Sequence, residues 1–180
     1  MERRTRMEYE FTLKFALSDP NADPETVLGA LQEAGCDDAL IGIGKRGRIA
    51  LDFSREADSA EKAVASAIAD VRRAIPGARF IEATPDFVGV TDIAKILGCS
   101  RQNVTKILAA SGSRFPDPIH EGSAAIWHLE SVLTWLIEHQ DRDFDARLVE
   151  ISRVTMRCNH LRDAGKWSRG AADPLRAAIA

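Results

Sequence analysis

The sequence predicts an α+β protein: a ferredoxin-like βαββαβ domain over residues 1–84, a helix-turn-helix domain over residues 87–139 and a C-terminal helix over residues 141–166. Two observations predict this order. Hydrophobic residues alternate with polar ones where strands are expected, and recur every three or four positions where helices are expected. After residue 87, a short turn that contains glycine separates two helical segments, each with a capping residue at its start.

The first strand is predicted from Tyr9 to Leu17, where aromatic and aliphatic residues alternate with Glu, Thr and Lys. Such a strand places one face on a core. Residues 18–24 are rich in Asp, Asn and Pro and predict a loop. A helix follows, and Gly35 is expected to end it. Its apolar stripe consists of Val27, Leu28, Leu31 and Ala34.

The rest of the first domain is predicted as two strands, a helix and a last strand. The strands cover residues 38–43, 48–53 and 78–83, and Asp58 or Ser59 is expected to cap the helix between the last two. The order is that of a split βαβ arrangement, in which two helices cover one face of an antiparallel sheet. The apolar stripe of the second helix consists of Val64, Ala67, Ile68, Val71 and Ile75.

Residues 42–47, GIGKRG, match the G-x-G-x-x-G pattern of a dinucleotide-binding loop. That loop must open a helix, so that a pyrophosphate lies at the helix N-terminus. Residues 48–53 alternate as a strand instead, so we expect a hairpin turn in which Gly44 and Gly47 adopt positive φ. Lys45 and Arg46 would then lie at the tip, in water or against a phosphate backbone.

A helix-turn-helix is expected after Thr84-Pro85-Asp86. Thr91 is the expected N-cap of its first helix, Gly98 its end, and Ser100 the N-cap of the second. The inward face of the second helix is expected to hold Val104, Ile107 and Leu108, and its outward face Arg101, Gln102, Asn103, Thr105 and Lys106.

The chemistry of the outward face suits double-stranded DNA. Arg can form bidentate hydrogen bonds with guanine, and Asn or Gln with adenine, from the first turns of a recognition helix in the major groove. Residues 91–115 contain four basic residues and one acidic residue, a local charge of +3, although the whole chain carries −3. The helix over residues 101–110 is therefore predicted to contact DNA, together with Ser100 and Arg114.

Several motifs over residues 87–139 resemble the MerR/excisionase-type winged helix-turn-helix, including small AlpA-like phage and plasmid regulators. They are, in order, Val90-Thr91, Leu97-Gly98-Cys99-Ser100, Phe115-Pro116-Asp117-Pro118-Ile119, Trp127 and Val132-Leu133-Thr134-Trp135-Leu136. The resemblance implies a β-wing after Phe115. Where many relatives carry basic residues in the wing, Glu121 here should repel phosphate, which leaves Ser123 or backbone N–H groups as contacts.

Trp127 and Trp135 are expected in the core, with stacking on exposed bases as the alternative. In the C-terminal helix, apolar residues recur at a spacing of about 3.5 residues, so the helix must fold back on its own domain or pair with a second copy. The stripe consists of Phe144, Leu148, Ile151, Thr155 and Cys158. Residues 167–180 are predicted to form a flexible tail.

Catalysis, cofactor binding and metal binding are not predicted. The four histidines show no H-x-x-x-H spacing, the three cysteines no C-x-x-C spacing, and no nucleophile elbow, P-loop or zincin motif occurs. Cys99, near a helix N-terminus, is expected to be a small buried residue of the turn, with a redox sensor as the alternative.

A membrane span is not expected, because no run of about 18 apolar residues occurs. The three separate cysteines indicate reduced thiols in the cytoplasm.

The sequence thus predicts a prokaryotic transcriptional regulator that acts as a homodimer through its first domain. Two alternatives remain open. The chain could be an antitoxin or a phage-type accessory DNA-binding factor whose first domain binds a partner protein, or a ligand-sensing regulator whose first sheet holds a small molecule.

Overall fold

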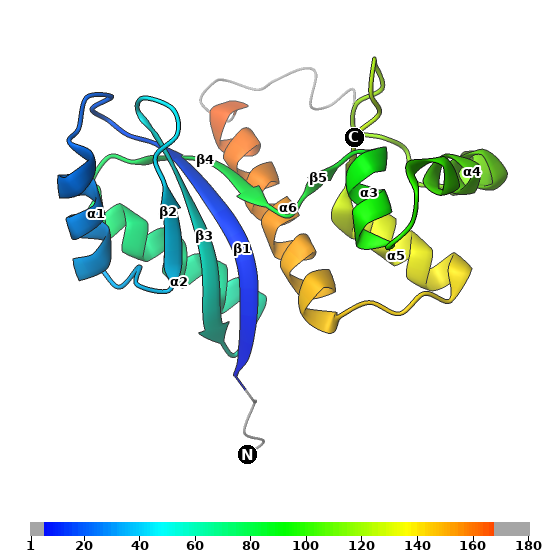
Figure 1. Ribbon diagram of the computed structural model, residues 1–180, viewed down its shortest axis with the longest axis horizontal. Helices are drawn as coiled ribbons and strands as arrows, with labels where there is room; N and C mark the ends of the chain where they lie inside the picture. Colours follow the sequence, from blue (N-terminus) through cyan, green and yellow to red (C-terminus); the bar gives the residue numbers. More distant parts are fainter. Residues whose placement is uncertain (1–5, 168–180) are drawn as a thin grey trace.

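The computed structural model describes residues 6–167 and shows a mixed α+β protein with a four-stranded antiparallel sheet (Figure 1). The predicted flexible tail, apart from Trp167, lies outside the described residues. In chain order the elements are β1 (Met7–Ala16), α1 (Pro24–Glu33), β2 (Ala39–Gly42), β3 (Arg48–Ala57), α2 (Ala60–Ala74), β4 (Arg79–Thr84), β5 (Phe87–Val88), α3 (Val90–Ile96), α4 (Arg101–Ser111), the 3₁₀ turn η1 (Gly112–Arg114), β6 (Trp127–His128), α5 (Leu129–Gln140) and α6 (Ala146–Trp167).

The sheet has the strand order β2-β3-β1-β4. Along β1 the residues alternate as predicted, so that Tyr9, Phe11, Leu13 and Phe15 are buried on one face. Three helices, α1, α2 and α6, contribute to the core on that face, and Figure 1 shows α2 and α6 behind the sheet. Within residues 6–167, none of the helices α1, α2 and α6 covers the other face of the sheet, so the polar residues of that face are available to line a site.

Local capping explains where α1 and α2 begin. Asp23 accepts a hydrogen bond of 2.9 Å from the backbone N–H of Thr26, and Ser59 caps α2 in the same way. Gly35, with φ of +88°, follows α1 as expected. Because each cap uses a side chain within three residues of the helix start, these boundaries could be predicted from the sequence.

The GIGKRG segment is a hairpin connection, because β2 and β3 pair antiparallel on either side of it. Gly47 has φ of +73°, and a Cβ there would lie 3.1 Å from the Cα of Pro20, so glycine is required. The same prediction for Gly44 is wrong: its φ is not positive, since a single left-handed residue completes this turn. The Arg46 guanidinium is exposed and donates to Asn21.

The helix α3 begins two residues earlier than predicted. Gly89 is its N-cap, and Asp92 Oδ2 accepts from the Gly89 N–H at 3.1 Å. Thr91 as the N-cap is therefore wrong, because the carboxylate of Asp92 satisfies the helix start and Thr91 lies in the first turn. Gly98, with φ of +61°, and Ser100, whose Oγ accepts from the Asn103 N–H at 3.2 Å, take their predicted roles.

A second, two-stranded sheet joins β5 to β6. The segment between Ile119 and Ile126, where a β-wing was implied, is a loop closed by one β-bridge between His120 and Ile126. Trp127 and Trp135 are only 5% and 8% exposed, which confirms that both are core residues. They pack against the ring of Phe115 and connect the loop to α5.

The C-terminal helix α6 starts at Ala146, five residues after the predicted start. Asp141 adopts a left-handed conformation with φ of +50° and ends α5, so residues 141–145 form a connection. The helix packs against β4, α2 and α5. Leu148 packs against two hydrophobic cores, one beneath the four-stranded sheet and one among α3, α4 and α5. The structure shows α6 folded back on the chain, but against both halves and not against a single domain as predicted.

Candidate functional site

The side chains predicted to contact DNA are all exposed. Five of them lie on α4, whose buried side is marked by Val104 with 1% exposure. Ser100 precedes the helix, Arg114 lies in η1, and Ser123 lies in the loop after His120. The five residues on α4 are Arg101, Gln102, Asn103, Thr105 and Lys106.

Some polar side chains at α4 form hydrogen bonds with the helix backbone, and others form none. The Ser100 hydroxyl caps the helix, and the Thr105 hydroxyl donates to the Arg101 carbonyl at 3.0 Å. Within residues 6–167, by contrast, no hydrogen bond or ion pair holds the side chain of Gln102 or Lys106, and none holds the Arg101 guanidinium or the Asn103 amide group. Four polar side chains on the first two turns of α4 are therefore available for a ligand.

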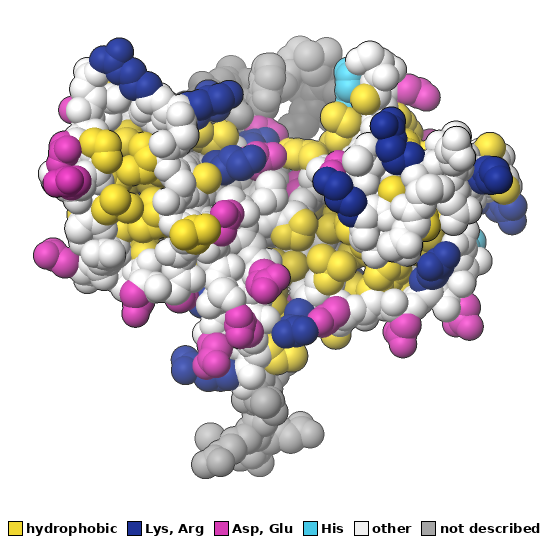
Figure 2. All heavy atoms as spheres, viewed as in Figure 1, with side chains coloured by type: hydrophobic (Ala, Val, Ile, Leu, Met, Phe, Trp, Pro, Cys, Tyr) yellow, Lys and Arg dark blue, Asp and Glu magenta, His cyan; other side chains and the backbone are white. Residues whose placement is uncertain are grey.

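A shallow hollow of about 610 Å³ lies between α4 and Val90 at the start of α3, and on α4 it is lined by Arg101, Gln102, Thr105 and Lys106. Figure 2 shows Lys and Arg side chains over the part of this face where α3 and α4 lie, with Asp and Glu side chains along its lower rim. Ser123 does not line this hollow, so it lies outside the group of predicted contacts that the hollow brings together.

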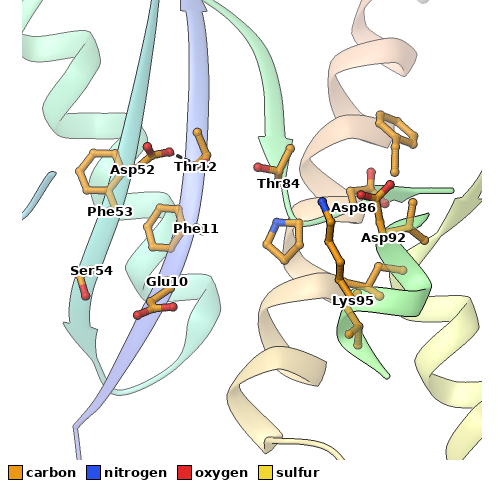
Figure 3. Close-up of a pocket in the computed structure, with 15 residues that line it drawn as sticks. Glu10, Phe11, Thr12, Asp52, Phe53, Ser54, Thr84, Asp86, Asp92 and Lys95 are labelled. Carbon is orange, nitrogen blue, oxygen red and sulfur yellow. Dashed lines mark hydrogen bonds between the residues drawn. The ribbon is translucent and has the colours of Figure 1, made fainter. Parts of the chain in front are cut away.

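A second candidate site is a cleft of about 650 Å³ between the open face of the sheet and α3 (Figure 3). From the sheet, Glu10, Asp52 and Thr12 line it, and the Thr12 hydroxyl donates to Asp52 Oδ1 at 2.7 Å. From α3, Asp92 and Lys95 line it. The lining thus combines four carboxylates, those of Glu10, Asp52, Asp92 and the buried Asp86, with the ammonium group of Lys95.

The sequence did not predict this cleft, because its residues come from separate strands and from α3. Their proximity depends on the register of β1 and β3, which places Thr12 opposite Asp52 and Glu10 opposite Ser54. The only signal in the sequence was the run of polar residues at the even-numbered positions of the first strand.

A buried polar cluster around Asp86 was also missed. Asp86 is 1% exposed, and its Oδ1 lies 2.6 Å from His128 Nδ1, while its Oδ2 accepts from Asn159 Nδ2 at 2.7 Å. His128 Nε2 in turn lies 3.1 Å from His160 Nε2. In the sequence, Asp86 belonged to a segment that marked a domain boundary, and its partners lie 42 and 73 residues further along the chain.

The cysteines form no disulfide: Cys36 is buried, and Cys99 and Cys158 are half-buried. Burial raises the pKa of the Cys36 thiol to about 11, and the negative charge of Asp70 adds to the effect. Burial also raises the pKa of Cys158.

Among residues 6–167, no helix combines the length and the apolar character needed to cross a bilayer. No group of three or more His, Cys, Asp and Glu side chains in that range is arranged to hold a metal ion. Comparisons with known protein families, with curated proteins and with solved structures found no match to the chain.

Proposed function

We propose that the protein is a sequence-specific DNA-binding transcriptional regulator that inserts α4 into the major groove. One observation carries the proposal: Arg101, Gln102, Asn103 and Lys106 are exposed and make no hydrogen bond through their side chains within the described chain. These residue types on the first turns of a helix can read base edges and neutralise phosphates.

The packing and capping of α4 favour a rigid recognition helix. Val104 is buried in the hydrophobic core that also contains residues of α3 and α5, and Ser100 caps the first turn. A recognition helix must keep its side chains in register with the bases, and a packed, capped helix loses little conformational entropy when it binds. We therefore take α3, α4 and the loop between His120 and Ile126 as a winged helix-turn-helix with a reduced wing.

We further propose that residues 7–84 form a ferredoxin-like domain that dimerises through β2. The strand order leaves β2 at an edge of the sheet, and Leu40 on it is 76% exposed. Residues 39–43, ALIGI, carry no charge and no proline, so the edge lacks the usual protection against pairing with another strand. A two-fold dimer would double the DNA site.

The cleft of Figure 3 supports a second candidate function, ligand sensing. Its volume lies within the range of small-molecule pockets, and carboxylates outnumber the single ammonium group on its walls. A small organic cation would suit that charge. Because the cleft touches both the sheet and α3, such a ligand would contact the DNA-binding half directly.

The DNA proposal is tested by selecting binding sites from random duplexes and measuring affinity by fluorescence anisotropy. We expect Asn103→Ala to weaken binding to the selected site by about 1–3 kcal/mol, which is roughly fivefold to 150-fold, and to relax the base preference at one position. The matched control is Gln32→Ala, which truncates an exposed amide side chain on α1, away from α4. Equal affinity of Asn103→Ala and wild type for the selected site, or no retained duplex at low salt, would refute the proposal.

A further inference from the structure

We propose that His128 and His160 form a binding site for a divalent transition metal ion such as Zn²⁺. The two imidazoles come from different parts of the chain, β6 and α6, and their Nε2 atoms lie 3.1 Å apart. The proposal concerns a site away from α4 and does not depend on the proposed DNA binding.

Asp86 sets the tautomer of His128. Its carboxylate is fully buried as a side chain and lies 2.6 Å from His128 Nδ1, so that nitrogen carries a proton and donates. The lone pair of Nε2 is then directed away from Asp86, toward His160. A buried carboxylate behind one imidazole nitrogen, with the other nitrogen free to bind, is the arrangement by which proteins orient histidine ligands and increase their basicity.

Asp86 is itself held in place from two sides. Asn159 Nδ2 donates to its second carboxylate oxygen at 2.7 Å, and the backbone N–H of Leu129 donates to its carbonyl at 2.6 Å. Asn159 is fully buried and also bonds both backbone groups of Ala83. The orientation of His128 is therefore fixed before any metal arrives, which lowers the entropic cost of binding.

The distance between the two Nε2 atoms suits a shared metal. Two ring nitrogens that each lie about 2.1 Å from a Zn²⁺ ion are roughly 3.0–3.4 Å apart, for angles at the metal between about 90° and the tetrahedral value. The ring centroids are 4.7 Å apart, which is shorter than the separation of two rings that meet head-on through a 3.1 Å contact between nitrogens, so the two nitrogen axes are not collinear. Without metal, one of the two Nε2 atoms must carry a proton to form the hydrogen bond, and since His128 is protonated at Nδ1, that atom is His160 Nε2. Metal binding would require neutral His160 to carry its proton on Nδ1 instead, so that both Nε2 lone pairs are free.

The surroundings allow a metal ion to enter. His160 is exposed on α6, and the side chain of His128 is 12% exposed. No third side chain among the described residues completes a ligand set, so water would fill the remaining positions. Two imidazoles with water favour ions that accept nitrogen ligands, in the order Ni²⁺ < Cu²⁺ > Zn²⁺. A bound ion would fasten α6 to β6 and thus join the two halves.

The test uses the full chain without a histidine tag, stripped with EDTA and titrated with ZnCl₂ by calorimetry. We expect wild type to bind Zn²⁺ with an affinity at least tenfold higher than that of His160→Gln. The matched control is His120→Gln, which removes another exposed imidazole away from the site and should leave the affinity unchanged. Circular dichroism would confirm that both variants are folded.

A second readout identifies the ligands directly. With Cu²⁺ in place of Zn²⁺, electron paramagnetic resonance should show coupling to two imidazole nitrogens in wild type and to one in His160→Gln. Equal Zn²⁺ affinity in wild type and His160→Gln, or a Cu²⁺ spectrum that the substitution leaves unchanged, would overturn the proposal. So would the absence of measurable Zn²⁺ binding to wild type.

Discussion

The hydroxyl of Tyr9 donates a hydrogen bond of 2.5 Å to Glu150 Oε2, and so ties the central strand β1 to α6. Tyr9 is fully buried, whereas Glu150 is half-buried. The bond matters for the architecture because α6 also packs against α5, so that one helix connects the sheet to the second core.

Tyr9→Phe should lower the free energy of unfolding by about 1–2 kcal/mol, because a hydrogen bond to a carboxylate is lost while the ring stays in place. Urea denaturation measures the change. Glu150→Gln keeps the size of the partner and removes its charge, and the double variant should lose less than the sum of the two single losses. Additive losses would show that the two groups do not interact in solution.

The side chain of Arg55 forms several hydrogen bonds and ion pairs in the first half of the chain. It is 8% exposed and bonds Asp38 at 2.6 and 2.9 Å, Asp70 at 2.7 Å, Ser66 and the Gly35 carbonyl. Burial disfavours its charged form, but the bonds to Asp38 and Asp70 outweigh burial and raise the pKa of Arg55. The cluster fastens β3 to α2 and to the segment after α1.

Arg55→Met should therefore destabilise the protein by about 3–5 kcal/mol, since it leaves two carboxylates partly buried without their cation. Thermal denaturation measures the loss. Lys62→Met is the control, because its ion pair with Asp58 is exposed and should contribute less than about 1 kcal/mol. Similar melting temperatures for the two variants would contradict the structural role of the cluster.

Features set by neighbouring residues could be predicted from the sequence, and features set by tertiary pairing could not. Ser100 and Gly98 act within one helical turn, so their roles followed from residue type alone. The bond between Asp86 and His128 depends on how β5 meets β6, and the carboxylates of the cleft depend on the pairing of β1 with β3. The prediction of Thr91 as the N-cap of α3 was wrong because the helix starts at Val90, where the side chain of Asp92 accepts a hydrogen bond from the Gly89 N–H.

The buried Cys36 thiol should make stability depend on pH in the alkaline range. Its pKa is about 11 in the folded chain, against 9.0 as the ordinary value, because burial disfavours the thiolate. The folded state then holds its proton while the unfolded state loses it, so this stabilisation is complete below pH 9 and is lost between about pH 9 and 11. Urea midpoints for wild type and Cys36→Ala across this range should converge, and parallel curves would contradict the prediction.

Lys106→Ala should weaken binding to all duplexes by a similar factor, in contrast to the base-specific loss expected for Asn103→Ala. If Lys106 neutralises one phosphate, the slope of log affinity against log salt should become shallower by about 1. Anisotropy titrations at several salt concentrations measure the slope. Arg72→Ala removes an exposed positive charge from α2 and serves as the control, because its slope should match that of wild type.

Leu40→Lys should convert the proposed dimer into a monomer. The substitution places a charge on the open edge strand β2, where Leu40 is 76% exposed and pairs on one side only, with Asp52 of β3. A charge at a sheet edge blocks pairing with another chain and leaves the fold intact, since no core contact is removed. Sedimentation velocity at several concentrations measures the mass, with Leu161→Lys, exposed on α6, as the control. If wild type sediments as a monomer throughout, or if Leu40→Lys remains a dimer, β2 is not the interface.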